Sequence, residues 1–312
     1  MVSVILRVLN CLEALARKTA NRPSGGGALH PRYRIPDCSF ANPNWVYRSG
    51  FLGSAFQEGL KSFQVRLTTS VAEPRSETYL KFGDGDYYFL RGIPLGSASP
   101  GKRAISKPLS DRALAFYGSQ ASRADFYLCE NLLPNRAMFH SIFRRQPDFP
   151  AEYTYGLLAS RWLTKEFAGS VGLIGSASKV KLVRRLLEFQ EYRDYLGLDG
   201  FEDYVEIPDL YAADEPTRSS VAVGEQLARA TSKIFLVGVG HLKSALFAEL
   251  GSYRAAVYLD VGSGIDALAG IIDTNRPYMQ NWINYQLDSR TPYENLDYLN
   301  FNNQNIKILS RP

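Results

Sequence analysis

The pattern of apolar and polar residues predicts strands and helices that alternate along most of the chain. Continuous apolar runs, typical of strands buried on both faces, lie at 78–82, 124–130, 170–177, 203–208, 233–240 and 255–262. Apolar residues with helical spacing mark 108–118, 155–167, 179–196, 219–232 and 242–251. From residue 170 onward strands and helices alternate regularly. We therefore expect an α/β fold, with a mostly parallel sheet covered by helices on both faces.

The two ends of the chain differ from this body. Residues 2–18 read as an amphipathic helix, and residues 21–31 are rich in Gly and Pro. The last residues are rich in Asn and Tyr and predict a mostly irregular tail. These patterns divide the chain into an N-terminal amphipathic helix at 1–20, a linker at 21–40, a single α/β domain at 41–285 and a C-terminal tail at 286–312.

Charge separates the N-terminal arm from the body. The net charge is +5, and residues 1–36 hold six basic groups and one acidic group, so the remaining residues sum to zero. A body without a basic excess argues against nucleic-acid binding. The helix at 2–18 could contact anionic lipid or pack on the protein itself, and both interpretations stay open.

Composition limits the cellular context and the type of metal. Three scattered cysteines show no disulfide framework, which fits a reducing cytoplasm, and no run of about 18 apolar residues predicts a membrane span. We expect a cytoplasmic protein, with the inner face of the membrane as an alternative place of contact. Because the chain has three histidines, a metal would need oxygen ligands.

An Asp-x-Asp pair follows the strand at 78–82, in the segment "YLKFGDGDYYFLRG". A turn alone would explain "GDGD", because Gly and Asp favour turns. At the end of a buried strand, however, Asp84 and Asp86 would offer hard oxygen ligands to Mg²⁺ or Mn²⁺, which also bind a diphosphate. Gly83 and Gly85 would let that diphosphate approach the backbone.

Two further segments combine a strand, glycines and a helix. "LVGVGHLKSAL" (236–246) places Gly238 and Gly240 before a helix, close to a dinucleotide fingerprint, but Lys243 stands at the third glycine position. This pattern favours a phosphorylated ligand over a nicotinamide cofactor, and a tight turn without a ligand is the alternative. In "GLIGSASKVKLVRR" (172–185), Lys179 and Lys181 could meet a phosphate or form a solvated helix face.

The segment "VYLDVGSGIDALAG" (257–270) is similar to the first motif of methyltransferases that use S-adenosylmethionine. That motif normally opens its domain, and here fewer than fifty residues follow it. Its position therefore argues against a methyltransferase.

Taken in order, several segments resemble the GT-D-type glycosyltransferases, which are nucleotide-sugar enzymes of bacterial glycan assembly. "KFGDGD" is similar to the "FGDGE" motif of that family. The remaining similar segments are "YGLLASRWLTKEFAGSVGLIG", "EIPDLYA", "IFLVGVGHLKSAL" and "VYLDVGSGIDALAG". The resemblance spans roughly residues 75–280. It implies a Rossmann-like fold, a Mn²⁺ or Mg²⁺ ion, and transfer of a sugar from a nucleotide donor to a glycan or lipid-linked acceptor used in polysaccharide biosynthesis.

The resemblance also assigns roles to single residues. It implies that Asp84 and Asp86 bind the metal, with Asp86 where the family commonly has Glu. Lys81 stands where Arg is expected, which keeps a cation near the phosphates but loses the bidentate geometry. Gly238, Gly240 and His241 match the late glycine loop only loosely. The donor is expected to be a UDP-, GDP- or dTDP-sugar.

Inverting transfer needs a general base near the acceptor hydroxyl. By position in the sequence the candidates are His241, Asp260 and Asp266, although His241 and Asp266 could simply cap helices. The donor site would use Lys81, Gly83, Gly85, Gly238, Gly240 and Lys243. A methyltransferase, an NAD-linked Rossmann oxidoreductase and a non-enzymatic scaffold remain the alternatives.

Overall fold

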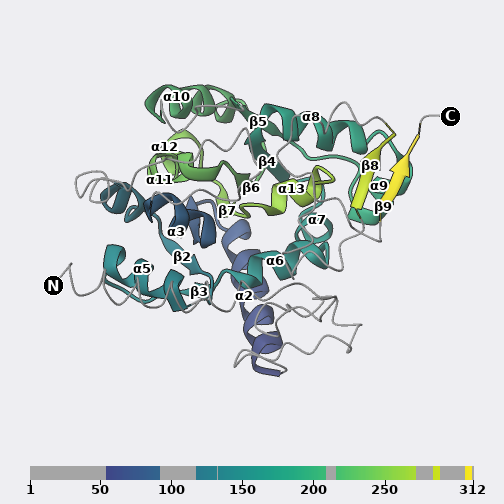
Figure 1. The fold of residues 1–312 in the computed structure, drawn as a ribbon. Coiled ribbons are helices and arrows are strands. Elements are labelled where there is room, and N and C mark those ends of the chain that lie inside the picture. Colours follow the sequence, from purple (N-terminus) through teal and green to yellow (C-terminus); the bar gives the residue numbers. More distant parts are fainter. Residues whose placement is uncertain are drawn as a thin grey trace.

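Seven parallel strands pair in the order β3-β2-β1-β7-β6-β4-β5 in a computed structural model of the chain (Figure 1). The structure describes residues 54–91, 117–131, 133–208, 216–271, 284–288 and 306–310. The strands are β1 (Glu77–Phe82), β2 (Phe126–Cys129), β3 (Phe149–Pro150), β4 (Val171–Ser176), β5 (Tyr204–Ile207), β6 (Ile234–Gly238) and β7 (Val257–Asp260). The expected α/β fold with a parallel sheet is confirmed, and the arrangement is consistent with a Rossmann-like fold.

Each predicted apolar run overlaps one of these strands, and β3 is the strand of this sheet that the pattern missed. It consists of only Phe149 and Pro150, so no apolar run announces it. The other strands are mostly apolar because the sheet is covered on both faces. Successive residues of β1 show this, since Tyr79 packs into one core and Leu80 into the other.

Helices cover both faces of the sheet (Figure 1). The first face packs against α2 (Ser54–Ala72), α6 (Glu152–Ala159), α7 (Trp162–Glu166), α8 (Ala177–Leu186), α9 (Gln190–Leu196) and α13 (Gly264–Leu268). The second face packs against α3 (Asp84–Arg91), α5 (Leu133–Phe143), α10 (Pro216–Leu227), the 3-10 turn η2 (Gly240–Leu242), α11 (Lys243–Leu246) and α12 (Leu250–Tyr253).

Three of the predicted helices are broken into shorter ones. The segment 155–167 forms α6 and α7, because Arg161 between them adopts a left-handed backbone with φ 61°. The segment 179–196 forms α8 and α9, separated by the extended Phe189. The segment 242–251 is divided among η2, α11 and α12. Of 108–118 only the last two residues are described, and they are helical.

The ends of the chain are described in part. The predicted N-terminal helix and the linker at 21–40 lie outside the described residues. In the C-terminal region, expected to be mostly irregular, β8 (Asn284–Leu287) and β9 (Ile306–Leu309) pair as a separate parallel sheet. Tyr285 of β8 packs against two tyrosines of α9. Its ring centroid lies 5.3 Å from that of Tyr192 and 5.0 Å from that of Tyr195. Among the described helices, none combines the length and the apolar character needed to cross a bilayer.

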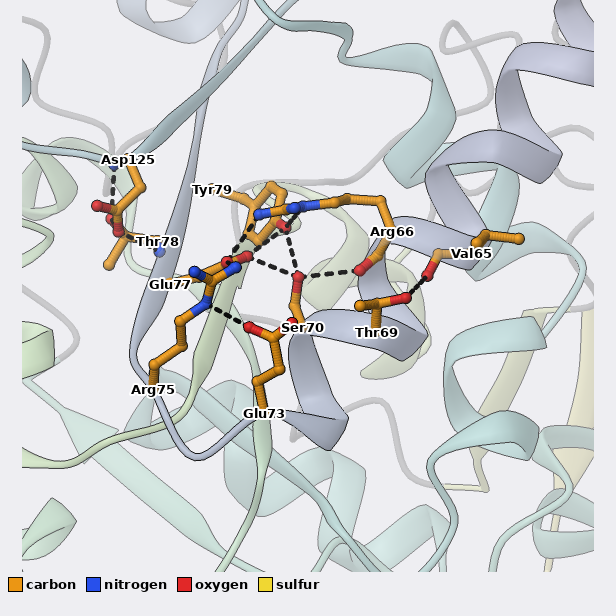
Figure 2. A network of polar contacts seen from close by, with 10 residues as sticks. All are labelled: Val65, Arg66, Thr69, Ser70, Glu73, Arg75, Glu77, Thr78, Tyr79 and Asp125. Atoms are coloured by element: carbon orange, nitrogen blue, oxygen red, sulfur yellow. Dashed lines mark hydrogen bonds and ion pairs between the residues drawn. The ribbon is translucent and has the colours of Figure 1, made fainter.

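A buried carboxylate fastens α2 to the amino end of β1 (Figure 2). Glu77 is 4% exposed and accepts hydrogen bonds from Ser70 Oγ (2.6 Å), Tyr79 OH (2.8 Å) and Arg66 Nη2 (2.7 Å). Arg75 Nη2 lies 2.6 Å from the same carboxylate. Burial alone would raise the pKa of Glu77, but the hydrogen bonds from Ser70 and Tyr79 and the arginine charges outweigh burial and lower it.

We predict that Glu77→Gln lowers the free energy of unfolding at pH 7 by about 2 kcal/mol, since charged hydrogen bonds are lost at a buried site. A carboxylate with a lowered folded pKa stabilises the protein above its unfolded pKa, which is near 4.5, and this contribution disappears as the pH falls through the folded value. Urea unfolding between pH 3 and pH 7 measures both effects. The exposed Glu58→Gln serves as control, and equal losses in the two variants would contradict the prediction.

Candidate functional site

The predicted site residues meet at one edge of the sheet. Because all seven strands are parallel, their carboxyl ends share this edge, here called the carboxyl edge. The predicted residues lie in or after the last part of three neighbouring strands: Lys81, Gly83, Asp84, Gly85 and Asp86 at β1, Gly238, Gly240, His241 and Lys243 at β6, and Asp260 and Asp266 at β7. The chain leaves β1 and β6 toward the second face and leaves β7 toward the first face. Such divergence creates the crevice where parallel α/β sheets bind ligands.

Asp86 lies inside this edge and is 3% exposed. It stands in the first turn of α3, where its Oδ2 accepts a hydrogen bond from the Gly83 amide (2.9 Å), as in half of a capping box. Tyr117 donates to Asp86 Oδ1 over 3.0 Å, and Lys243 Nζ lies 2.6 Å from Oδ2. Both oxygens therefore have protein donors.

Lys243 holds the ends of three strands together. Its ammonium contacts Asp86 Oδ2, Asp260 Oδ2 at 3.1 Å, and the carbonyl oxygen of Lys81. An ammonium has three N–H donors, so these three acceptors use all of them. Burial lowers the pKa of Lys243, but Asp260 and Asp86 outweigh burial and raise it, so the lysine stays charged at neutral pH. We call Lys243, Asp86, Asp260 and the backbone of Lys81 the Lys243 cluster.

The expected general bases are paired or lie outside the description. Asp260 Oδ1 accepts from the Gly262 amide (2.9 Å), and its Oδ2 accepts from the Lys81 amide (3.1 Å) as well as facing Lys243. Asp266, in α13, is buried and forms an ion pair with Lys179 of α8. The backbone of His241 belongs to η2, and its side chain lies outside the described part of the chain. Asp260 and Asp266 are thus each ion-paired with a lysine.

A second polar group lies at the same edge of the sheet. Lys81 Nζ donates a hydrogen bond to Tyr155 OH over 2.6 Å. The Tyr155 hydroxyl in turn donates to Glu130 Oε1 over 3.2 Å. Asn135 Nδ2 donates to Glu130 Oε2 over 2.9 Å. Lys81 Nζ is 3.8 Å from Glu130 Oε1, which makes a long ion pair. Lys81, Tyr155, Glu130 and Asn135 form what we call the Lys81 cluster.

The site glycines fall into two kinds. A side chain at Gly83 would approach Glu130 Oε1 to 2.7 Å, and one at Gly238 would approach Ile265 Cγ2 to 2.5 Å, so both glycines leave room for protein atoms. A Cβ atom added at Gly85 or Gly240, by contrast, would have no described atom outside the adjacent backbone within 4 Å. Gly85 and Gly240 are therefore the positions where a ligand could approach the backbone.

Glu152 is a further acid of this edge, and it follows β3. Its Oε1 accepts a hydrogen bond from the Asn131 amide over 2.8 Å, whereas its buried Oε2 has no hydrogen-bond partner among the described residues. Burial, assisted by the negative charge of Glu130, raises the pKa of Glu152 to about 7. A carboxyl group with this pKa exchanges protons near neutral pH.

Sequence reasoning missed Glu130, Tyr155 and Glu152. Glu130 directly ends the predicted strand 124–130, so the rule that ligands lie at strand ends could have found it. Tyr155 looks like an ordinary core aromatic in a helical pattern. Glu152 gave no signal, because the strand before it has only two residues.

The described residues do not complete a site for Mn²⁺ or Mg²⁺ in this arrangement. Asp86 is neutralised by Lys243 and hydrogen-bonded through both oxygens. Within the described ranges, no group of three or more His, Cys, Asp or Glu side chains is arranged to hold a metal ion. Asp84 begins α3, and its side chain is not among those that the structure describes. Metal binding by Asp84 and Asp86 stays a prediction.

We predict that Lys243→Met destabilises the fold by about 3–5 kcal/mol, because it leaves Asp86 and Asp260 buried without a counter-charge. Adding Asp86→Asn to this variant should restore part of the loss, since one uncompensated charge is then removed. Urea unfolding measures the two variants beside Lys233→Met, which alters an exposed lysine. A loss below about 1 kcal/mol for Lys243→Met would show that the cluster does not hold the edge together.

Comparisons of this chain with protein-family models, with curated proteins and with solved structures gave no match. Since a fold supports many functions, the function of this chain is inferred from the residues at its carboxyl edge.

Proposed function

We propose that this chain transfers a sugar from a nucleoside-diphosphate sugar to a hydroxyl group of a glycan or lipid-linked acceptor. The observation that supports this most is the place of the Asp84–Gly85–Asp86 segment. It opens α3 directly at the end of β1, a central strand, beside the ends of β7 and β6. Ligands of parallel α/β sheets bind at such a position, and the Asp-x-Asp pattern suits a donor diphosphate.

Backbone groups at this edge support a site for the donor. Gly85 and Gly240 leave space beside the main chain, and Gly240 adopts φ +56°, which favours glycine. α3 begins at this edge, and the free amides at the start of a helix stabilise negative charge. Lys81 and Lys243 add positive charge near this site. The Lys243 ammonium, however, already has a protein acceptor for each of its three N–H groups.

The balance of charges supports a role for an added cation. In the described part of the edge, Lys81 and Lys243 face the buried carboxylates Asp86, Asp260 and Glu130. Asp266, also buried, is paired with Lys179, so one more carboxylate than lysine remains among these groups. A diphosphate brings further negative charge to this cluster, which repels it. We therefore retain Mn²⁺ or Mg²⁺ in the proposal, with Asp84 as its expected ligand, and the experiment below tests this with and without metal.

The alternatives have less support from the same edge. A nicotinamide cofactor needs a helix start for its pyrophosphate, but β6 continues into the 3-10 turn η2 and the four-residue α11. A methyltransferase does not explain the Asp-x-Asp pair.

We place the reaction in the cytoplasm, where nucleotide sugars and reduced cysteines occur together. Contact of residues 2–18 with the inner face of the membrane would bring the enzyme to a lipid-linked acceptor. This part of the proposal rests on the sequence pattern, since those residues lie outside the description.

We predict that UDP, GDP or dTDP, or one of their sugar conjugates, raises the melting temperature of the wild-type protein in the presence of Mn²⁺. At a concentration of 100 times Kd, a ligand stabilises the folded state by about 2.7 kcal/mol. Asp84→Asn should remove most of this shift and leave the unliganded melting temperature unchanged. The exposed Asp199→Asn is the matched control and should keep the shift.

Other outcomes of this screen would reject the proposal. A shift with S-adenosylmethionine or NAD alone, indifferent to Asp84→Asn, would support one of the alternatives. A nucleotide shift of equal size in EDTA would remove the divalent metal from the proposal while keeping the donor.

A further inference from the structure

The backbone holds Glu152 at a fixed position on the carboxyl edge. Strand β3 ends at Pro150, and the amide of Ala151 donates to the carbonyl of Cys129 over 3.1 Å, so α6 starts beside the end of β2. The Asn131 amide then donates to Glu152 Oε1 over 2.8 Å. One carboxylate oxygen is thus anchored by main chain, which orients the other.

The second oxygen of Glu152 is buried and has no hydrogen-bond partner in the described part of the protein. Buried side-chain oxygens are almost always hydrogen-bonded, so each exception asks for an explanation, and a catalytic role is one of the recognised ones. Asp86 and Asp260, in the same edge, show the contrasting case. Each has donors on both oxygens and a lysine as counter-charge.

The charges around Glu152 also differ from those around the paired aspartates. Glu130, at the end of β2, faces it with a like charge that raises its pKa, and Lys81 of β1 lowers this pKa by less than Glu130 raises it. The Lys81 ammonium is engaged by Tyr155 OH and by Glu130. Tyr153, the next residue in α6, is a neutral neighbour whose pKa is raised by burial. Glu152 therefore has no cation committed to it among the groups that face it.

We propose that Glu152 is the acid–base residue of this site and that its unpaired Oε2 receives the proton of the acceptor hydroxyl. The proposal rests on the sugar-transfer function. In the step, the acceptor O–H bond breaks and a bond forms between that oxygen and the anomeric carbon of the donor. The bond from this carbon to the phosphate oxygen breaks, and the nucleoside diphosphate leaves with the electron pair. Glu152 ends the step protonated and returns its proton to solvent.

The protonation behaviour of Glu152 suits this role. Burial raises its pKa to about 7, so both the acid and the base form are populated at neutral pH. A general base works best when its pKa lies near the working pH. The raised value has a cost in stability, because the unfolded chain ionises near pH 4.5 and the folded protein only near pH 7. Stability should therefore fall as the pH rises between these two values.

A first experiment tests this cost in stability without any substrate. Glu152→Gln removes the ionisation, so its melting temperature should equal that of wild type at pH 4, below the unfolded pKa, and exceed it by about 3 °C or more at pH 8. The exposed Glu166→Gln of α7 is the control and should match wild type at both values. If Glu152→Gln is less stable than wild type at pH 8, the carboxylate is structural and the inference is overturned.

A second experiment measures turnover of the nucleotide sugar that stabilises the protein, with water or the acceptor receiving the sugar. Glu152→Gln should reduce kcat by about 100-fold or more and leave nucleotide binding unchanged. The wild-type rate should rise from pH 5 to a plateau above about pH 7, and this rise should be absent from the variant. Glu152→Asp, which withdraws the carboxylate by one methylene, should lose turnover although it keeps the charge.

The outcomes distinguish a failure of the role of Glu152 from a failure of the sugar-transfer function. Wild-type turnover with an unchanged pH profile in Glu152→Gln overturns the role of Glu152, while nucleotide binding still supports sugar transfer. If no nucleotide stabilises wild type, sugar transfer is overturned, and the step assigned to Glu152 is overturned with it.

Discussion

The ion pairs of Lys243 are the interaction on which the carboxyl edge depends. One ammonium contacts Asp86 after β1, Asp260 at the end of β7 and the carbonyl of Lys81, and it is itself carried by α11 after β6. Buried charges are tolerated only when they are paired and hydrogen-bonded, so none of these groups can move alone. The relative positions of three neighbouring strand ends, and of the first turn of α3, follow from this single cation.

The same edge contains a second, less balanced region. Around Lys81, the hydroxyl of Tyr155 and the carboxylate of Glu130 satisfy one another, but Glu152 beside them keeps a buried oxygen without a partner in the described residues. Natural proteins give up stability at functional sites in this way. The proposed proton transfer rests on this arrangement, in which a paired region that fixes geometry lies next to an acid with one oxygen unpartnered among the described residues.

Most of the sheet could be predicted because strands that are buried on both faces are mostly apolar along the sequence. The edge at which Asp86, Lys243 and Asp260 meet followed from parallel topology alone. Their partners did not, because a sequence does not show that Lys243 lies between two carboxylates rather than on a phosphate. Helix breaks were missed for a similar reason. Arg161 adopts φ 61°, a conformation imposed by packing and not by local preference.

Hydrogen–deuterium exchange of the wild-type protein with and without the stabilising nucleotide tests the central claim most directly, namely that the ligand binds at the carboxyl edge. We expect protection in the segments 83–91, 238–246 and 260–268, which follow β1, β6 and β7. The amino end of β1, where Glu77 binds α2, should remain unchanged. Protection confined to that amino end, or absent from all three segments, would contradict the account.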